Sequence, residues 1–118
     1  MAPRVVRNAR EAFVERVKAI DPIFRRGDLK AFWPLLRELM DIGPGRPDLS
    51  KKKSHYLASL AARSLARGDP EAARAFLDYA DRSIDPAHMT AYLIDERKEF
   101  RRHTEAALAS KAALRDAR

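Results

Sequence analysis

The chain contains no cysteine, and this absence excludes several classes of function. Disulfides, thiolate metal sites and cysteine nucleophiles all require that side chain. Its absence favours a reducing compartment, and residues 1–7 contain no apolar run long enough for a signal peptide. No stretch approaches the roughly 20 apolar residues that a membrane span needs. We therefore expect a cytoplasmic protein that does not enter a membrane.

Catalytic motifs are also absent from the sequence. The histidines His55, His88 and His103 show no paired metal-ligand spacing. Glu99 and His103 are one helical turn apart and could share a metal, but no second pair completes a site. Glu96 is expected to be exposed, which gives no reason for a raised pKa. Because glycine-rich phosphate loops and nucleophile elbows are missing too, the sequence predicts a non-enzymatic protein without a metal or cofactor.

Long alternating runs of Val, Ile and Thr are missing, which argues against a β-sheet. Alanine, leucine, arginine and glutamate are abundant, and these residues favour helices. A length of 118 residues suits one domain. The sequence therefore predicts a single all-α domain over residues 1–118, and its free use of arginine is typical of bacterial GC-rich genomes.

Apolar residues at spacings of three and four predict about five helices. They are expected over residues 8–20, 28–40, 50–67, 69–83 and from 86 almost to the carboxyl terminus. Short turns between them favour antiparallel hairpins, arranged as a compact bundle or a short array with a long last helix.

Several local signals set the expected helix boundaries. Asp21-Pro22 is expected to end the first helix or to begin a short turn of helix, and Pro34 could lie in a first turn or kink the second helix. Asp69-Pro70 and Asp85-Pro86 each combine a capping aspartate with proline at the first helical position. The segment 41–48 holds two glycines and two prolines and is the clearest loop.

Two further expectations concern the chain ends and the aromatic residues. Residues 1–7 and 110–118 are expected to fray, because apolar residues are sparse there. The aromatic residues at helical spacings are expected to lie mostly in the core: Phe13, Phe32, Trp33, Tyr56, Phe76, Tyr79, Tyr92 and Phe100. Trp33, beside a proline, could instead line a peptide groove if the hairpins form an open array.

Two segments 41 residues apart resemble each other, since Arg26-Gly27-Asp28 recurs as Arg67-Gly68-Asp69. The second copy, together with the helix before it, resembles one tetratricopeptide repeat over residues 54–86. The matching positions are Leu57, Leu60, Ala61, Gly68, Asp69, Ala73, Leu77, Ala80 and Pro86. The segment departs from the family pattern by one extra residue before Pro86 and by Ser64 near an expected aromatic. The resemblance implies a scaffold that binds peptides or proteins on a concave face, although such arrays usually need about three repeats.

The net charge of +7 favours an anionic partner. Ten basic and seven acidic residues lie in 1–50, and fourteen and ten lie in 51–118, so the excess is spread along the chain. Lys51, Lys52 and Lys53 are expected in the first turn of a helix, where cations oppose the helix dipole but could bind phosphate together with His55 and Arg46.

A second basic cluster lies on the last predicted helix. Arg97, Lys98, Arg101 and Arg102 form a broad cationic face that could contact phosphates or an acidic partner. Interleaved acidic residues are expected to neutralise part of this face through pairs within the helix. A helix-turn-helix reader is disfavoured, because helix 69–83 is acidic and has no Asn, Gln or Lys to read bases.

Two functions remain open. The first is a non-enzymatic helical-hairpin module, an adaptor or regulatory subunit, that binds a protein partner and could also form a homodimer through its last helix. The second is a basic protein that contacts the nucleic-acid phosphate backbone without sequence specificity.

Overall fold

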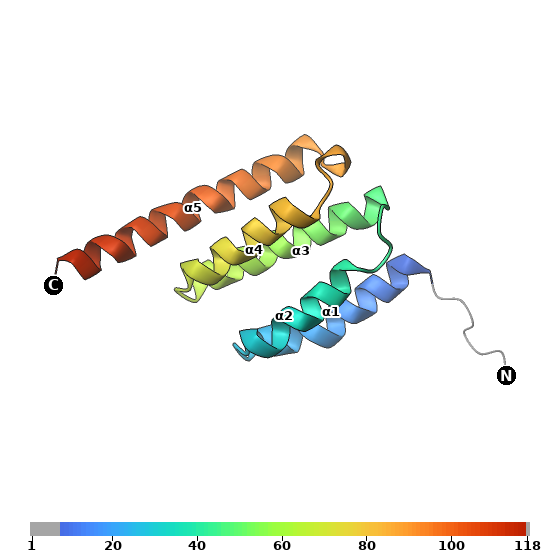
Figure 1. The fold of residues 1–118 in the computed structure, drawn as a ribbon, viewed down its shortest axis with the longest axis horizontal. Coiled ribbons are helices and arrows are strands. Elements are labelled where there is room, and N and C mark those ends of the chain that lie inside the picture. The colour runs from blue at the N-terminus through green and yellow to red at the C-terminus, as the bar shows by residue number, and fades with distance from the viewer. Residues whose placement is uncertain (1–7, 118) are drawn as a thin grey trace. The chain divides into compact units, whose positions relative to one another are not determined.

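The computed structural model describes residues 8–117, and the segment 1–7 expected to fray lies outside them. The described residues form five α-helices and one short 3₁₀-helix, with no strand among them (Figure 1). The predicted all-α class is confirmed. The elements are α1 (Ala9–Arg25), α2 (Leu29–Met40), α3 (Pro47–Ala66), α4 (Pro70–Ser83), η1 (Pro86–His88) and α5 (Ala91–Asp116).

The chain divides into two compact units, and the boundary falls inside α3. Unit 1 is Met1–Leu49 and contains α1, α2 and the first residues of α3. Unit 2 is Ser50–Arg118 and contains the rest of α3 with α4, η1 and α5. Independent folding of the whole chain as one domain stays a prediction.

Unit 1 is built on a hairpin of α1 and α2. α1 continues through Pro22, so the expectation that Asp21-Pro22 ends this helix is wrong. Proline removes a single N–H from the ladder, and the residues after it still gain from burial, since Phe24 is fully buried. The ring of Phe24 packs on Phe32 of α2, with centroids 5.4 Å apart, and this contact joins the two helices.

The two hairpins use the same turn, 41 residues apart. Gly27 and Gly68 both have positive φ, at 83° and 78°, as a left-handed residue after a helix requires. The next residue then caps the following helix. Asp28 accepts a hydrogen bond from the Ala31 N–H at 3.1 Å. Asp69 accepts one from the Ala72 N–H at the same distance. The repeated Arg-Gly-Asp therefore encodes a repeated turn.

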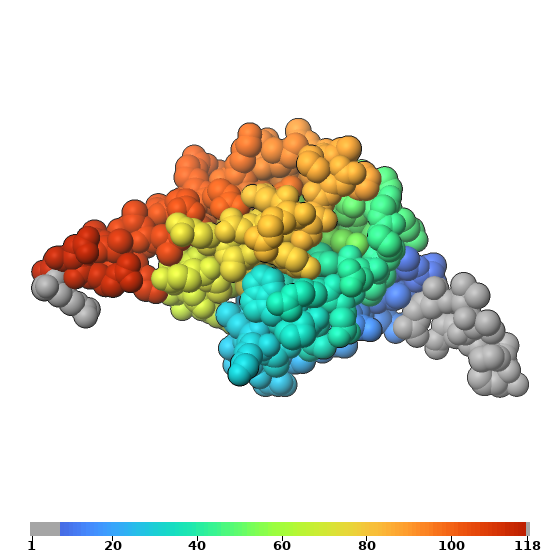
Figure 2. All heavy atoms as spheres, viewed as in Figure 1, coloured from blue at the N-terminus to red at the C-terminus, as the bar shows by residue number. Residues whose placement is uncertain are grey.

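In unit 2, α4 runs antiparallel to α3 and then α5 runs antiparallel to α4 (Figure 1). α4 buries one apolar stripe, which comprises Pro70, Ala73, Phe76, Leu77 and Ala80. α5 is longer, at 26 residues, yet its buried residues are only Leu93 and Thr104. The last turns of α5 extend past the first turn of α4 (Figure 2). Little apolar burial therefore holds the longest helix in place.

Two predicted boundaries are wrong. α3 begins at Pro47, inside the segment expected to be a loop, because proline suits the first helical position and Asp48 suits the first turn. The last helix does not begin at Pro86. Residues Pro86–His88 form η1, and Thr90 starts α5 by accepting a hydrogen bond from the Leu93 N–H at 3.3 Å. α5 is helical through Asp116, and fraying of its end stays a prediction.

Within residues 8–117, no helix combines the length and the apolar character that crossing a membrane requires.

We predict that the two aspartate caps contribute equally to stability. Asp69→Ala should lower the free energy of unfolding by about 1 kcal/mol, because it leaves a helix N–H without its acceptor. Asp69→Asn keeps an acceptor oxygen and should cost much less. Urea unfolding followed by circular dichroism measures both, and the same pair of substitutions at Asp28 should behave alike. Equal losses for Ala and Asn would show that the caps do not act through this hydrogen bond.

Candidate functional site

Opposite charges line the contact between α4 and α5. Lys111 binds Glu71 at 2.9 Å, and Glu105 binds Arg74 at 2.6 Å. Further along, Arg101 binds Asp78 at 3.0 Å. From one pair to the next the residue number rises on α4 and falls on α5, as antiparallel helices require. We call this set, completed by the Asp81 contacts below, the α4–α5 ion-pair ladder.

The sign of the charges changes along the ladder, and this change specifies the register. From its amino end α4 presents an acid, a base and then two acids, and α5 presents the opposite sign at each position. A slip by one helical turn would move Arg74 from Glu105 toward Arg101, which places two cations together. The ladder therefore favours one alignment of the two helices, as charge pairs do in other paired helices.

Two rungs of the ladder shift pKa values. The hydrogen bond from the Lys111 ammonium lowers the pKa of Glu71 below its ordinary 4.5. The fork of the Arg74 guanidinium lowers the pKa of Glu105 and raises the pKa of Arg74 in return. The fork is bidentate, with Nε donating to one oxygen at 3.1 Å and Nη2 to the other at 2.6 Å.

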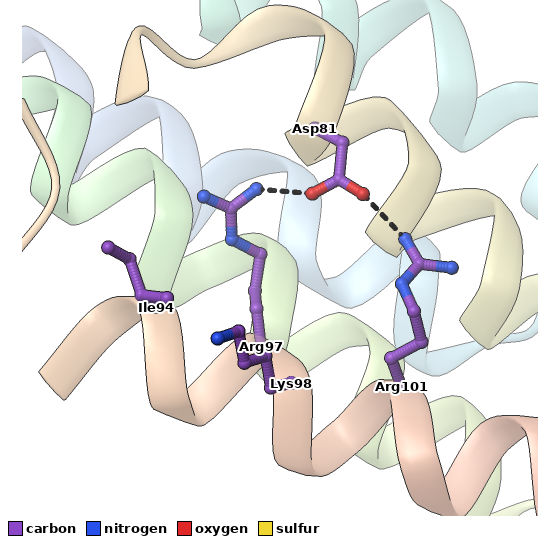
Figure 3. Close-up of a pocket in the computed structure, with 5 residues that line it drawn as sticks. All are labelled: Asp81, Ile94, Arg97, Lys98 and Arg101. Atoms are coloured by element: carbon purple, nitrogen blue, oxygen red, sulfur yellow. Dashed lines mark hydrogen bonds and ion pairs between the residues drawn. The ribbon is translucent and has the colours of Figure 1, made fainter. Parts of the chain in front are cut away.

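Two of the four cations of the predicted basic face, Arg97 and Arg101, pair with acids from α4 (Figure 3). Asp81 accepts from Arg97 Nη1 at 2.7 Å and from Arg101 Nη2 at 2.8 Å. Neutralisation was expected from acids within the same helix, but these two arginines turn to the neighbouring helix. The acids that make α4 unsuitable as a DNA reader thus have a structural role.

The other two members of the basic face differ from each other. Arg102 pairs with Glu99 within α5, as expected. Glu99 also binds His103 at 3.0 Å. Lys98 is exposed and forms no ion pair within the described residues. Lys98 is therefore the one cation of the predicted basic face that has no acidic partner within residues 8–117.

The lysine run lies differently from the prediction. Because α3 begins at Pro47, the lysines occupy its second turn rather than its first, and Asp48 takes the position near the dipole. The expected conflict with the helix dipole is therefore absent. Lys51 and Lys52 are exposed and make no ion pair within residues 8–117. Lys53 is 7% exposed, so it does not join them as a surface contact.

Two polar contacts join α3 to the segment around the start of α5. Ser50 Oγ lies 2.7 Å from His88 Nδ1. Five residues further along α3, His55 Nδ1 lies 3.4 Å from a carboxylate oxygen of Glu96. The Glu96 side chain is 13% exposed, so the expectation that it is solvated is wrong. Sequence reasoning missed both contacts, because partners 38 and 41 residues apart leave no local signal.

The tyrosine between these contacts points to solvent. Tyr92 is 69% exposed, so its predicted place in the core is wrong. It lies in the first turn of α5, which the contacts of Ser50 and His55 bring alongside the second turn of α3. We define the α3–α5 face as Lys51, Lys52, His55 and Tyr92.

Ser50, His88 and Asp85 are the residue types of a nucleophilic serine site, but their geometry is that of a structural tie. Asp85 Oδ2 is 3.7 Å from His88 Nε2, which is beyond hydrogen-bond distance. Its other oxygen caps η1 by accepting from the Ala87 N–H at 2.9 Å. Ser50 is 8% exposed, which leaves its hydroxyl little access to a substrate. The three residues hold η1 against α3.

The remaining candidates lie in unit 1. Arg46 forks Asp48 with contacts of 2.9 and 3.3 Å, and this hydrogen bonding lowers the pKa of Asp48. Trp33 lies on α2, half-buried, and its role as a groove residue stays a prediction. Among the described residues, no group of three or more histidines and carboxylates is placed to hold a metal ion.

Comparison with known proteins yields no matching family model, no matching curated protein and no matching solved structure.

We predict that the outermost rung of the ladder tolerates exchange of its two charges. Glu71→Lys or Lys111→Glu alone should lower the melting temperature, because each places like charges together. The double substitution restores the pair and should recover most of the loss. Thermal unfolding of the four proteins in low salt measures this coupling. Additive losses in the double variant would contradict a specific contact between the two side chains.

We predict that stability falls on acidification through the ladder carboxylates. Their pKa values are lowered in the folded state, so the stabilisation is fully present above the unfolded value of 4.5. It is lost as the pH falls through the lowered folded values. In the double variant Glu71→Gln with Glu105→Gln, the free energy of unfolding measured in urea should change less between about pH 5 and pH 3 than in the parent chain. An unchanged slope in that double variant would exclude this linkage.

Proposed function

We propose that the protein is a non-enzymatic interaction module, an adaptor or regulatory subunit, whose α3–α5 face binds an acidic segment of a partner protein. The observation that carries the proposal is the contrast between two groups of cations. Arg97, Arg101 and Arg102 are already bound to acids of the same chain. Lys51 and Lys52 are exposed and unpaired within the described residues, which leaves them available to a partner.

The neighbours of these lysines suit a protein ligand. Tyr92 offers a large apolar ring with a polar hydroxyl, a combination that is enriched at protein interfaces. The His55 side chain is 65% exposed and adds a titratable donor. Exposed cations on α3 and an exposed aromatic residue on α5 would complement a segment that carries both acidic and apolar side chains.

The order of the helices gives further support. The hairpin α3–α4 is followed by α5, which contacts α3 again through Glu96 and His55. The resemblance to a tetratricopeptide repeat implies a scaffold that binds peptides or proteins on a concave face. In such an arrangement the α3–α5 face would be part of the binding surface.

The alternative, non-specific binding to nucleic-acid phosphates, has less support. Such binding gains affinity from each cation that replaces a counterion. Three of the four cations of the predicted basic face already bind an acid of their own chain, which reduces the counterion release that binding would gain. The net charge of +7 is the observation that keeps this alternative in the test. A homodimer would use the exposed Leu114 of α5 and is tested by the mass in solution.

We predict that charge reversal on the α3–α5 face abolishes recovery of the partner. Lys51→Glu with Lys52→Glu should reduce capture from native lysate at least about fivefold, because an acidic ligand would then meet two like charges. Lys18→Glu with Lys30→Glu is the matched control, since both lysines are exposed and lie in unit 1. Capture should resist nuclease.

Fluorescence anisotropy with DNA and RNA separates the two functions. The proposed function predicts flat signals at about 150 mM salt, whereas phosphate binding predicts affinity that falls steeply with salt. Nuclease-sensitive capture, or equal losses in the variant and the control, would overturn the proposal.

A further inference from the structure

A small cavity opens on the side of α5 that faces α4. It has a volume of about 250 Å³. Its lining consists of Asp81 from α4 and of Ile94, Arg97, Lys98 and Arg101 from α5 (Figure 3). Three of these five side chains are cations and one is an anion, so the lining carries an excess of positive charge.

The guanidinium groups keep donors beyond those that Asp81 uses. Asp81 accepts one N–H from Arg97 and one from Arg101, and Nη1 of Arg101 also lies 3.0 Å from Asp78. Each guanidinium has five N–H donors in a fixed plane. The Nε of Arg97 is buried and has no hydrogen-bond partner in the structure. A buried donor without an acceptor carries a desolvation penalty.

Lys98 adds a third donor group to the cavity. Its side chain is exposed and makes no ion pair within the described part of the chain. Binding of an anion would therefore cost Lys98 no existing contact. On the wall of the cavity Ile94 is 38% exposed and supplies an apolar surface.

We infer that this cavity binds a single phosphate group, held by Arg97, Lys98 and Arg101. A phosphate presents more acceptor oxygens than a carboxylate, and arginine forks match its geometry. The volume is smaller than the 300 to 1,000 Å³ typical of drug-sized ligands, so it suits one anionic group. Asp81 competes with the anion for both arginines and Asp78 competes for Arg101, while Ile94 in the lining offers an apolar contact to a phosphate monoester. This site is separate from the α3–α5 face and does not depend on the proposed function.

The test is an NMR titration of the full chain that follows the arginine Nε–Hε signals. The probes are inorganic phosphate and methyl phosphate, with sodium chloride at matched ionic strength as the reference. We expect a saturable shift of the Arg97 Nε signal with a dissociation constant on the order of 1–10 mM, because so few atoms are in contact. If methyl phosphate binds more tightly than inorganic phosphate, the site is assigned to phosphate monoesters. If the two bind equally, the site is assigned to the free phosphate ion.

Three variants make the result specific. Lys98→Gln should weaken binding at least about threefold, because it removes the unpaired cation. Lys52→Gln removes one charge of the same sign from the α3–α5 face and should leave the affinity unchanged. Asp81→Asn removes the competing carboxylate and should tighten binding, provided that circular dichroism shows a folded chain. If it does not, Lys98→Gln decides alone.

The inference would be overturned if phosphate shifted the arginine Nε–Hε signals no more than sodium chloride does. It would also be overturned if Lys98→Gln and Lys52→Gln changed the affinity for phosphate equally. Loss of phosphate binding would leave partner capture by the α3–α5 face intact, so the two proposals fail independently.

Discussion

The charge pairing between α4 and α5 is the interaction on which the organisation of unit 2 depends. α5 buries Leu93 and Thr104 and half-buries Phe100 and Leu108, so apolar burial specifies its position less strongly than that of α4. The alternation of sign along the α4–α5 ion-pair ladder supplies the missing information about register. Exposed ion pairs contribute little free energy individually, and they are screened by salt. The longest helix is therefore well specified in alignment but weakly held toward its carboxyl end.

The same pairing decides which cations remain available for function. A sequence rich in arginine on one helix suggests an anion-binding face, but here α4 supplies acids that occupy Arg97 and Arg101. Lys51 and Lys52 make no ion pair within residues 8–117. Internal pairing therefore changes how readily each cation is available to a ligand, and net charge alone does not identify the available ones. Tyr92, in the first turn of α5, is an exposed large aromatic side chain.

Local signals predicted the helices well, because caps and apolar spacing act over a few residues. The Arg-Gly-Asp turns and the caps at Asp28 and Asp69 were readable in this way. Boundaries at proline were not, since Pro22 lies inside α1 while Pro47 begins α3. A proline permits both a helix start and a late helical turn, and tertiary burial decides between them. The pairing of Arg97 with Asp81 and the burial of Glu96 depend on contacts between helices, which periodicity within one helix does not reveal.

Amide hydrogen exchange along α5 as a function of salt tests the central claim most directly. If the ladder positions α5, raising the sodium chloride concentration from about 0.05 M to about 1 M shortens the Debye length and should accelerate exchange over residues 101–112. Amides of α1 and α2, whose contact includes the packing of Phe24 on Phe32, should change far less. Exchange in α5 that is unaffected by salt, or that accelerates equally in all helices, would contradict the account.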